Sequence, residues 1–363
     1  MFGLVLISII TLMHVYVFWR ASTAGFQHRF LQKKFLFGAG IFLWTLFFAG
    51  RVYGHSHAGE LARILEFVGM NWMGILFLIF ISVMTVDCVT FFGLLFPRRA
   101  PTLRRLGFAA GVLLSAIALF QGLRPPVIQE YEVQIPNLPD ELNGTTILAL
   151  SDLHIGSLLD KHWLAKRIDQ VQAEHPDLIF LLGDIFEGHS LSPSELMPVL
   201  QGLAAPLGVW SVNGNHENHG TDMMPPMEEA GFRVLRNRWM EVRPGLILAG
   251  IDDLTALRRS GKDSDIVTRT LAGRPQAATI LLTHSPLQYT QAAQAGVALM
   301  LSGHTHGGQI WPFGFLTKHF YPLLGGRYQV GKMTVIVSRG AGTWGPRMRL
   351  WNPSEILKIT LVR

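Results

Sequence analysis

Cysteine is almost absent from this 363-residue chain, which contains one, Cys88. A single cysteine excludes a disulfide within the chain and excludes a metal site built from several thiolates. Any bound metal ion must therefore be held by nitrogen and oxygen ligands. The lack of disulfides does not place the protein in the cytosol, because a large domain can be stable without them.

Charge is also scarce: charged residues make up 15% of the chain and hydrophobic residues 49%. This balance is poorer in charge than that of an average soluble domain and predicts a membrane portion. The positive charge lies in the more apolar part, since residues 1–130 carry a net charge of +7 and residues 131–363 one of −1. A nucleic-acid-binding protein should concentrate basic residues on its folded domain, so no nucleic-acid partner is expected.

Four apolar stretches precede residue 125, each near the roughly 20 residues that a helix needs to cross a bilayer. They predict a transmembrane domain over residues 1–124, with spans at about 1–19, 35–50, 73–96 and 106–123. The first stretch lacks a basic start, which favours an anchor. The A-S-T-A sequence at 21–24 leaves a cleaved signal peptide as the alternative.

Loop charges predict the orientation of these spans. Basic residues are concentrated after the first and third spans, at positions 20, 29, 33 and 34 and at positions 98, 99, 104 and 105. By the positive-inside rule, both loops face the cytoplasm. We therefore expect a multi-pass protein of the inner (cytoplasmic) membrane with an extracytoplasmic C-terminal domain, an orientation that one span more or fewer would reverse.

Asp87 lies inside the third predicted span, near the middle of the membrane at about 1.5 Å per residue. A carboxylate in this position is either functional, or makes a hydrogen bond between packed helices, or is a neutral, protonated acid. Because the spans offer it no evident partner charge, the packing role is the favoured interpretation.

Beyond residue 130, short β-rich apolar runs alternate with amphipathic stretches. The apolar runs cover residues 145–154, 177–184, 208–217, 245–253, 278–286 and 297–306, and helices are expected at 161–174 and 194–203. Continuous apolar runs separated by helices are typical of strands buried on both faces of a sheet. The predicted fold is therefore an α-helical membrane region of four spans followed by an α/β layered sandwich over residues 131–363.

Five of these runs end in a polar cluster, namely S-D-L-H, G-D, G-N-H-E, T-H-S and G-H-T-H. Ligands bind at the carboxyl ends of strands in layered α/β folds, so the five clusters can converge on one site. A single such residue is more often structural, but seven nitrogen and oxygen donors at successive strand ends favour a metal site of Mn²⁺, Fe²⁺ or Zn²⁺. The candidate metal ligands are Asp152, His154, Asp184, Asn215, His284, His304 and His306.

These five motifs, in this order, resemble the signature of the calcineurin-like metallophosphoesterase family, with the resemblance extending over residues 145–363. The sequences at 304–310 and 338–346 are similar to those of a bacterial membrane-associated subgroup. The N-P-S-E-I ending at 352–356 also resembles that subgroup, except that Ser354 replaces an expected second proline.

The resemblance implies a site with two divalent metal ions. One ion would be bound by Asp152, His154 and His306 and the other by Asn215, His284 and His304, with Asp184 bridging them. The ions would activate a water molecule as the nucleophile. The resemblance also assigns the catalytic role to His216, which would stabilise the phosphoryl charge or protonate the leaving oxygen; a structural histidine is the alternative.

Other histidines are left out of this site. The G-H-S-H-A-G sequence at 54–59 imitates the last metal motif, but it lies between two predicted spans. His189 and His219 are expected in solvated loops.

Two apolar segments, 223–227 and 310–321, follow metal motifs. They either pack within the domain or form an apolar rim against a lipid or the bilayer surface. Arg339, Arg347 and Arg349 either bind a phosphate head group or are surface charges.

The sequence thus predicts a membrane-anchored, metal-dependent phosphoesterase that contacts membrane lipids and acts on a phosphorylated substrate, with a lipid as the leading option. One alternative is the same chemistry facing the cytoplasm on a nucleotide-linked lipid precursor. The other is a non-catalytic membrane binding or sensor protein. The oligomeric state does not follow from the sequence.

Overall fold

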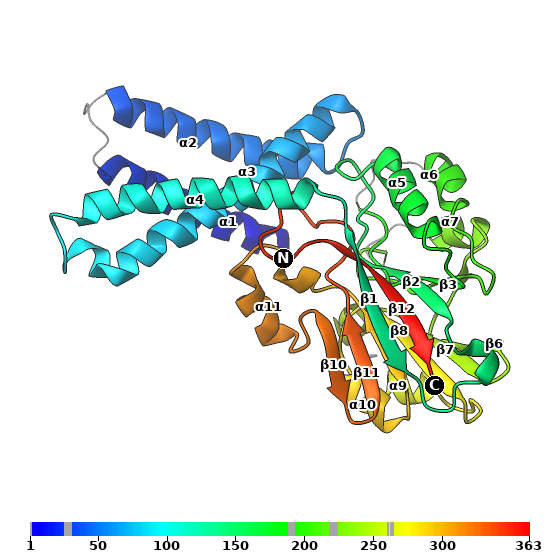
Figure 1. Ribbon diagram of the computed structural model, residues 1–363. Coiled ribbons are helices and arrows are strands. Elements are labelled where there is room, and N and C mark those ends of the chain that lie inside the picture. Colours follow the sequence, from blue (N-terminus) through cyan, green and yellow to red (C-terminus); the bar gives the residue numbers. More distant parts are fainter. Residues whose placement is uncertain (1, 25–30, 188–192, 218–223, 260, 262–264) are drawn as a thin grey trace. The chain divides into compact units, whose positions relative to one another are not determined.

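The computed structural model describes residues 2–24, 31–187, 193–217, 224–259, 261 and 265–363. The chain forms two compact units, Met1–Leu123 with Gly345–Leu350, and Arg124–Trp344 with Trp351–Arg363. The first unit contains four long helices and the second contains two β-sheets (Figure 1). The short segment Gly345–Leu350 belongs with the helices although it comes late in the sequence.

Four helices of the first unit are long and apolar enough to cross a membrane. They are α1 (Phe2–Thr23), α2 (Leu31–Ala49), α3 (Glu60–Val89) and α4 (Ala100–Leu123), with a π-helical turn at Gly50–Gly54 after α2. Small residues let the helices approach closely, since a Cβ at Gly69 of α3 would lie 2.7 Å from the carbonyl oxygen of Leu46 in α2. The predicted number of long apolar helices is confirmed. The third, α3, runs from Glu60 to Val89, whereas the sequence placed a span at about 73–96.

Because α3 ends at Val89, Asp87 lies in the last turn of its helix and not in the middle of a span. The expectation that it has no partner charge is wrong as well. Its buried carboxylate lies 2.5 Å from Nε of Arg20 and 2.8 Å from Nε of Arg104, and it accepts a hydrogen bond of 2.5 Å from the hydroxyl of Tyr16. These partners do not follow from the sequence, because both arginines lie in the predicted loops.

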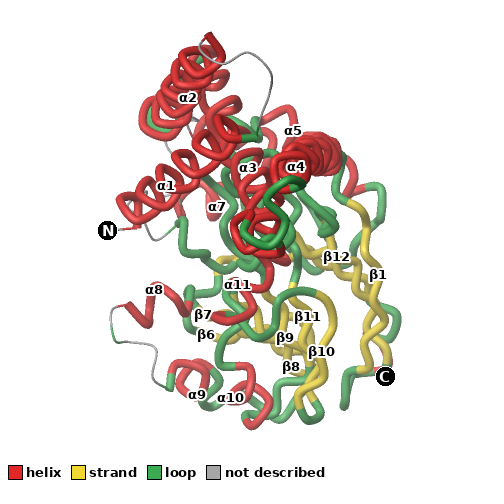
Figure 2. The backbone as a smooth tube through the Cα atoms, turned by 90° about the vertical axis from the view of Figure 1, so that its left-hand side faces the viewer, coloured by secondary structure: helices red, strands yellow, loops and turns green. Residues whose placement is uncertain are grey.

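The second unit contains two six-stranded sheets, shown as yellow strands in Figure 2. In order, the first comprises β1 (Val127–Gln134), β12 (Glu355–Val362), β2 (Thr146–Leu150), β3 (Leu178–Leu181), β4 (Val209–Ser211) and β5 (Arg233–Val234). The second comprises β10 (Gly326–Val330), β11 (Met333–Val337), β9 (Leu299–Ser302), β8 (Ala278–Thr283), β7 (Leu246–Ile251) and β6 (Arg238–Arg243). Strands β2 to β5 are parallel, as are β7, β8, β9 and β11, so their carboxyl ends point the same way within each sheet.

Three hydrophobic clusters hold these sheets in layers. One lies between the sheets and includes Phe180 and Trp210 of the first and Leu248 and Leu282 of the second. The other two cover outer faces: the first sheet packs against α5 (Lys161–Gln172) and α6 (Pro193–Leu200), and the second against α9 (Ile266–Thr270) and α10 (Tyr289–Gln294). The remaining described α-helices are α7 (Met224–Glu229), α8 (Leu254–Arg259) and α11 (Phe313–Phe320).

The central strands are therefore covered on both faces. Every residue of β3, β7, β8 and β9 is buried, as the continuous apolar runs indicated. The predicted α/β layered sandwich is confirmed.

Candidate metal centre

The candidate ligands directly follow the carboxyl ends of five strands, three in the first sheet and two in the second. Asp152 and His154 follow β2, Asp184 follows β3, Asn215 and His216 follow β4, His284 follows β8, and His304 and His306 follow β9. Six of the seven candidate ligands, together with His216, form groups in which the ligand atoms lie within 4.8 Å of one another: Asp152, His154, Asp184, His284, His304 and His306.

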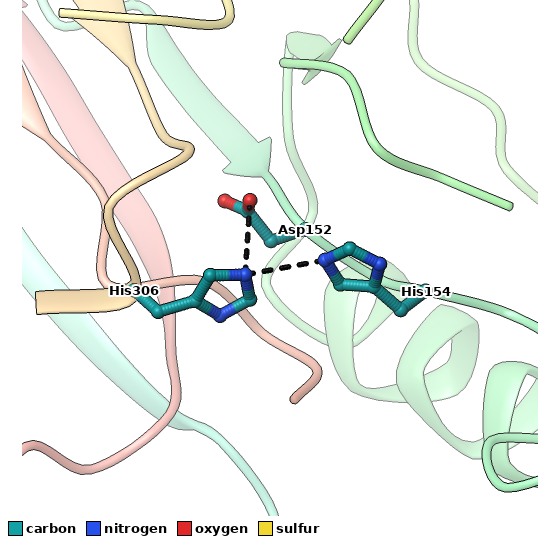
Figure 3. Close-up of side chains that lie close together, drawn as sticks. All are labelled: Asp152, His154 and His306. Atoms are coloured by element: carbon teal, nitrogen blue, oxygen red, sulfur yellow. Dashed lines mark hydrogen bonds and ion pairs between the residues drawn. The ribbon is translucent and has the colours of Figure 1, made fainter. Parts of the chain in front are cut away.

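The first group of possible metal ligands is Asp152, His154 and His306 (Figure 3). Nε2 of His306 lies 3.3 Å from Oδ1 of Asp152 and 3.2 Å from Nε2 of His154. Such separations suit donors that share one ion at bond lengths of about 2.0–2.2 Å. All three side chains are buried, so their ring nitrogens and carboxylate face one another away from bulk water.

The second group is Asp184, His284 and His304. Nε2 of His284 lies 3.1 Å from Oδ2 of Asp184 and 3.2 Å from Nδ1 of His304. Nδ1 of His284 lies 2.8 Å from the carbonyl oxygen of Leu182, which can only accept a hydrogen bond, so Nδ1 carries a proton whether the ring is neutral or charged. When the ring is neutral, Nε2 directs a lone pair towards the carboxylate of Asp184, an arrangement that a cation between them stabilises.

Asn215 provides an independent test of whether a metal ion fits. Its Oδ1 atom is buried, and within the described part of the chain no group donates a hydrogen bond to it. A buried amide oxygen without a donor is costly, and coordination of a cation removes that cost. Imidazole, carboxylate and amide donors together fit a divalent ion of the Mn²⁺, Fe²⁺ or Zn²⁺ type.

The electrostatic field of the site also favours a cation. Burial opposes ionisation of Asp184, yet the charge of His284 and their hydrogen bond hold the pKa of Asp184 well below its usual value. Burial would likewise lower the pKa of His284, but the charges of Asp184 and Asp152 raise it well above its usual value. The two carboxylates thus stabilise positive charge among these side chains.

The backbone at the candidate ligands is strained, because φ is positive at five of them. These are Asp152 (+54°), His154 (+47°), Asp184 (+52°), His304 (+71°) and His306 (+50°). Non-glycine residues rarely adopt this conformation, and such outliers cluster at functional sites. Close packing adds to the constraint: a Cβ at Gly214 would lie 2.0 Å from Oδ1 of Asp184, so only glycine fits there.

Glu187 orients two of the histidines and was not among the predicted site residues. Its Oε2 atom accepts hydrogen bonds from Nδ1 of His154 at 2.7 Å and Nδ1 of His216 at 2.8 Å. The first bond turns Nε2 of His154 towards the candidate ligand His306, and the second holds His216 with its Nε2 atom 3.9 Å from Oδ2 of Asp184. Burial would lower the pKa of His216, but the bond to Glu187 and the charge of Asp184 raise it to about 9.

Two more supporting residues were missed. Glu217, the last residue of G-N-H-E, accepts hydrogen bonds from the backbone nitrogens of Asp184 (2.9 Å) and Gly214 (2.7 Å), which ties the ends of β3 and β4 together. The hydroxyl of Tyr321 lies 2.8 Å from Nε2 of His304. Acidic residues within the G-D-I-F-E and G-N-H-E sequences could have indicated Glu187 and Glu217, but no motif marks Tyr321.

The histidines between the second and third spans have other partners. His55 hydrogen-bonds to Glu66 at 3.0 Å and His57 to the carbonyl oxygen of Tyr53 at 3.0 Å. Among the described residues, neither belongs to a group that could hold a metal ion. His189 and His219 lie outside the described residues, as does Met223 at the start of the apolar segment 223–227.

The three arginines considered for phosphate binding differ in their surroundings. Nε of Arg339 lies 2.7 Å from Oε2 of the buried Glu355, and Arg339 lines a pocket of about 360 Å³ together with Gly307 and Lys318. Arg347 and Arg349 are buried within the segment Gly345–Leu350 of the helical unit, so the interpretation as surface charges is wrong for both.

Known proteins are similar to this chain in sequence. Residues 145–308 match the family model of the calcineurin-like phosphoesterases. A metallophosphoesterase of Campylobacter jejuni, described as uncharacterized, is 30% identical over 380 aligned residues, which cover 99% of this chain and 98% of that protein. The chain belongs to the calcineurin-like metallophosphoesterases. It is therefore an enzyme of the hydrolase class, as the sequence predicted.

A transmembrane protein with a metallophosphoesterase domain from Bos taurus is 31% identical to this metallophosphoesterase over 266 residues. The match covers 69% of this chain and 60% of the bovine protein. Together with four helices long enough to cross a bilayer, it indicates that this metallophosphoesterase is a membrane protein. Among solved structures, a dimetal phosphatase from Danio rerio is 14% identical with a TM-score of 0.35, covering 60% of this chain and 99% of that chain.

Proposed function

We propose that this metallophosphoesterase is a two-metal enzyme that hydrolyses a phosphomonoester, phosphodiester or pyrophosphate bond in a membrane lipid. The position of Asp184 carries the proposal. Its carboxylate lies within 4.8 Å of the ligand atoms of His154 and also of those of His284 and His304. A carboxylate that reaches both ligand groups is suited to bridge two ions.

Each side chain then has a defined task. Asp152, His154 and His306 would hold one ion, and Asn215, His284 and His304 the other. Two divalent ions would supply Lewis-acid activation of a water nucleophile and neutralise charge on the phosphoryl oxygens. His216, held at Nδ1 by Glu187, would stabilise the phosphoryl group or donate a proton from Nε2 to the leaving oxygen.

Placement at a membrane supports a lipid substrate. Arg124, the first residue of the sheet unit, directly follows Leu123, the last residue of α4, so the enzyme is tethered without a long linker. The basic residues at the helix ends support an extracytoplasmic site in the inner membrane. Arg20 and Arg104 are buried beside Asp87 and count less towards this charge. Lys33 and Lys34 in the first turn of α2, and Arg98 and Arg99 before α4, still make both connections basic.

Metal removal and reloading test the reaction. Full-length protein purified in detergent should lose phosphoester hydrolysis after chelation and regain it with Mn²⁺, Fe²⁺ or Zn²⁺. The assay would use a soluble monoester, a soluble diester and a panel of membrane phospholipids and lipid pyrophosphates in mixed micelles. If no substrate is turned over faster than by an Asp184→Asn blank, the enzyme proposal fails and the binding or sensor alternative is favoured.

A reporter fused to the C-terminus tests the orientation. Alkaline phosphatase, active only outside the cytoplasm, should be active in this fusion, and green fluorescent protein, fluorescent in the cytoplasm, should be dark. The opposite pattern would overturn the proposed orientation and favour a cytoplasmic, nucleotide-linked lipid precursor as substrate.

A further inference from the structure

Helix α11 and two tryptophans beside it form an exposed apolar surface that the proposed reaction does not explain. We call this set the α11 surface. Its members, with their exposed fractions, are Trp311 (40%), Phe313 (46%), Phe315 (72%), Leu316 (54%), Phe320 (64%) and Trp351 (54%). The ring centroids of Trp311 and Trp351 are 5.0 Å apart, so these two rings lie against each other. In Figure 1, α11 is the separate short orange helix outside both sheets.

The domain core does not account for this surface. All residues of α11 are described, and none of them is buried. Since one aromatic side chain offers roughly 150–250 Å², the exposed parts of the five aromatic members amount to about 400–700 Å², which reaches or exceeds the largest apolar patch of a typical soluble monomer. A helix that is apolar but has no buried residue needs another apolar environment.

The α11 surface is firmly connected to the metal centre. A Cβ at Gly308 would lie 2.2 Å from the Cα atom of Gly314, so the turn after His306 and the start of α11 touch backbone to backbone. At the other end of the helix, the hydroxyl of Tyr321 lies 2.8 Å from Nε2 of His304. The hydroxyl of Thr305 also donates a hydrogen bond to the carbonyl oxygen of Leu324. Contacts at both ends hold α11 beside the residues that would bind metal.

We propose that the α11 surface docks on the lipid bilayer, with its aromatic side chains at the boundary between head groups and acyl chains. Its composition fits this partner, because phenylalanine, leucine and tryptophan gather there with the exposed Lys318 and His319 on the same helix. Aromatic rings and basic residues in one short helix are typical of interfacial membrane helices.

Chain continuity favours a bilayer over another protein as the partner. Trp351 directly follows Leu350, the last residue of a segment that clusters with the membrane helices. Arg124 at the start of the sheet unit is bonded to Leu123, the last residue of α4. The sheet unit is therefore tethered to membrane-spanning helices at several points in the chain, and a bilayer surface is always within reach of a short tether.

Quenching by spin-labelled lipids tests the docking. In a Cys88→Ser background, which has no other cysteine, Phe315→Cys would be labelled with a fluorophore in full-length protein reconstituted into anionic phospholipid nanodiscs. Lipids with a doxyl group high on the acyl chain should quench this label nearly as strongly as a label at Leu12→Cys, which is exposed on α1. A label at Gln329→Cys, exposed on β10, is the matched control on the sheet unit and should not be quenched.

Each outcome decides the proposal. Quenching at position 315 no stronger than at position 329 overturns it. If the label is instead shielded from both doxyl lipid and aqueous iodide, protein covers the α11 surface, which also overturns it. Phe320→Cys gives a second, independent position, so a labelling failure at one site leaves the test intact. Because the readout is lipid contact and not turnover, its result stands whether or not the proposed reaction is correct.

Discussion

Replacing Asp184 with asparagine is expected to lower kcat/KM of the metal-loaded enzyme by more than about 100-fold, because loss of groups that merely orient metal ligands already costs roughly 10–100-fold. The substitution keeps the shape of the side chain but removes the charge that reaches both ligand groups. It also removes the ion-pair contact of 3.1 Å with Nε2 of His284. Metal content and initial rates of phosphoester hydrolysis, measured on the same preparation, give the result.

A graded series makes this test specific. Glu187→Gln weakens the orientation of His154 and His216 without removing a ligand, so a loss of about 10–100-fold is expected. Asp177→Asn is the matched control. Asp177 directly precedes β3, at the end of the strand away from Asp184, and accepts a hydrogen bond from the backbone nitrogen of Thr146. Wild-type kcat/KM in a folded Asp184→Asn protein would contradict the assignment of Asp184 as the bridging ligand.

Replacing Asp87 with asparagine is expected to destabilise the helical unit by about 3–5 kcal/mol, the usual cost of removing one member of a buried ion pair. Asp87 is fully buried, and its carboxylate joins Arg20 at the end of α1 to Arg104 near the start of α4. Without its charge, two buried guanidinium groups repel each other and lose their counter-ion. The midpoint of thermal unfolding in detergent, followed by circular dichroism, measures the change.

Two further variants test whether the loss of stability is specific to the ion pairs of Asp87 or follows from the removal of any charge. Glu60→Gln removes an exposed acid that forms an ion pair with Arg63 three residues later, so little change is expected. Combining Asp87→Asn with Arg104→Gln should lower the free energy of unfolding by less than the two single losses added together. Each single variant leaves the other residue without this ion-pair partner, whereas the double variant removes both. An unchanged unfolding midpoint in Asp87→Asn would show that the ion pairs contribute no stability.

The elements that sequence analysis predicted depend on local patterns. Continuous apolar runs identified β2, β3, β4, β7, β8 and β9, since each of these strands lies in a core between two layers. The outer strand β1 was missed, because its side chains are mostly exposed or half-buried and its place in the sheet comes from pairing with β12 at the far end of the chain. Long-range pairing leaves no periodicity in a short segment.

Helix boundaries and charge partners were the least predictable features. Hydropathy located the third span, but α3 begins at Glu60, well before the apolar run, and ends at Val89, before the run ends. Both Arg20 and Arg104 were assigned to loops, since a single sequence does not show which side chains meet after helices pack. Glu187 and Tyr321 were missed for the same reason, as they act on histidines far away in sequence.

For this metallophosphoesterase, the sequence by itself determined the four apolar helices, the layered sandwich and the set of donor residues that follow the strands. These properties depend on composition, on periodicity and on short motifs, all of which are local. Only the tertiary structure decided how the donors group around Asp184, which acids orient the histidines, how Asp87 is neutralised and that α11 buries none of its residues. Those features depend on distances between side chains that are remote along the chain, and such distances exist only once the strands and helices have packed.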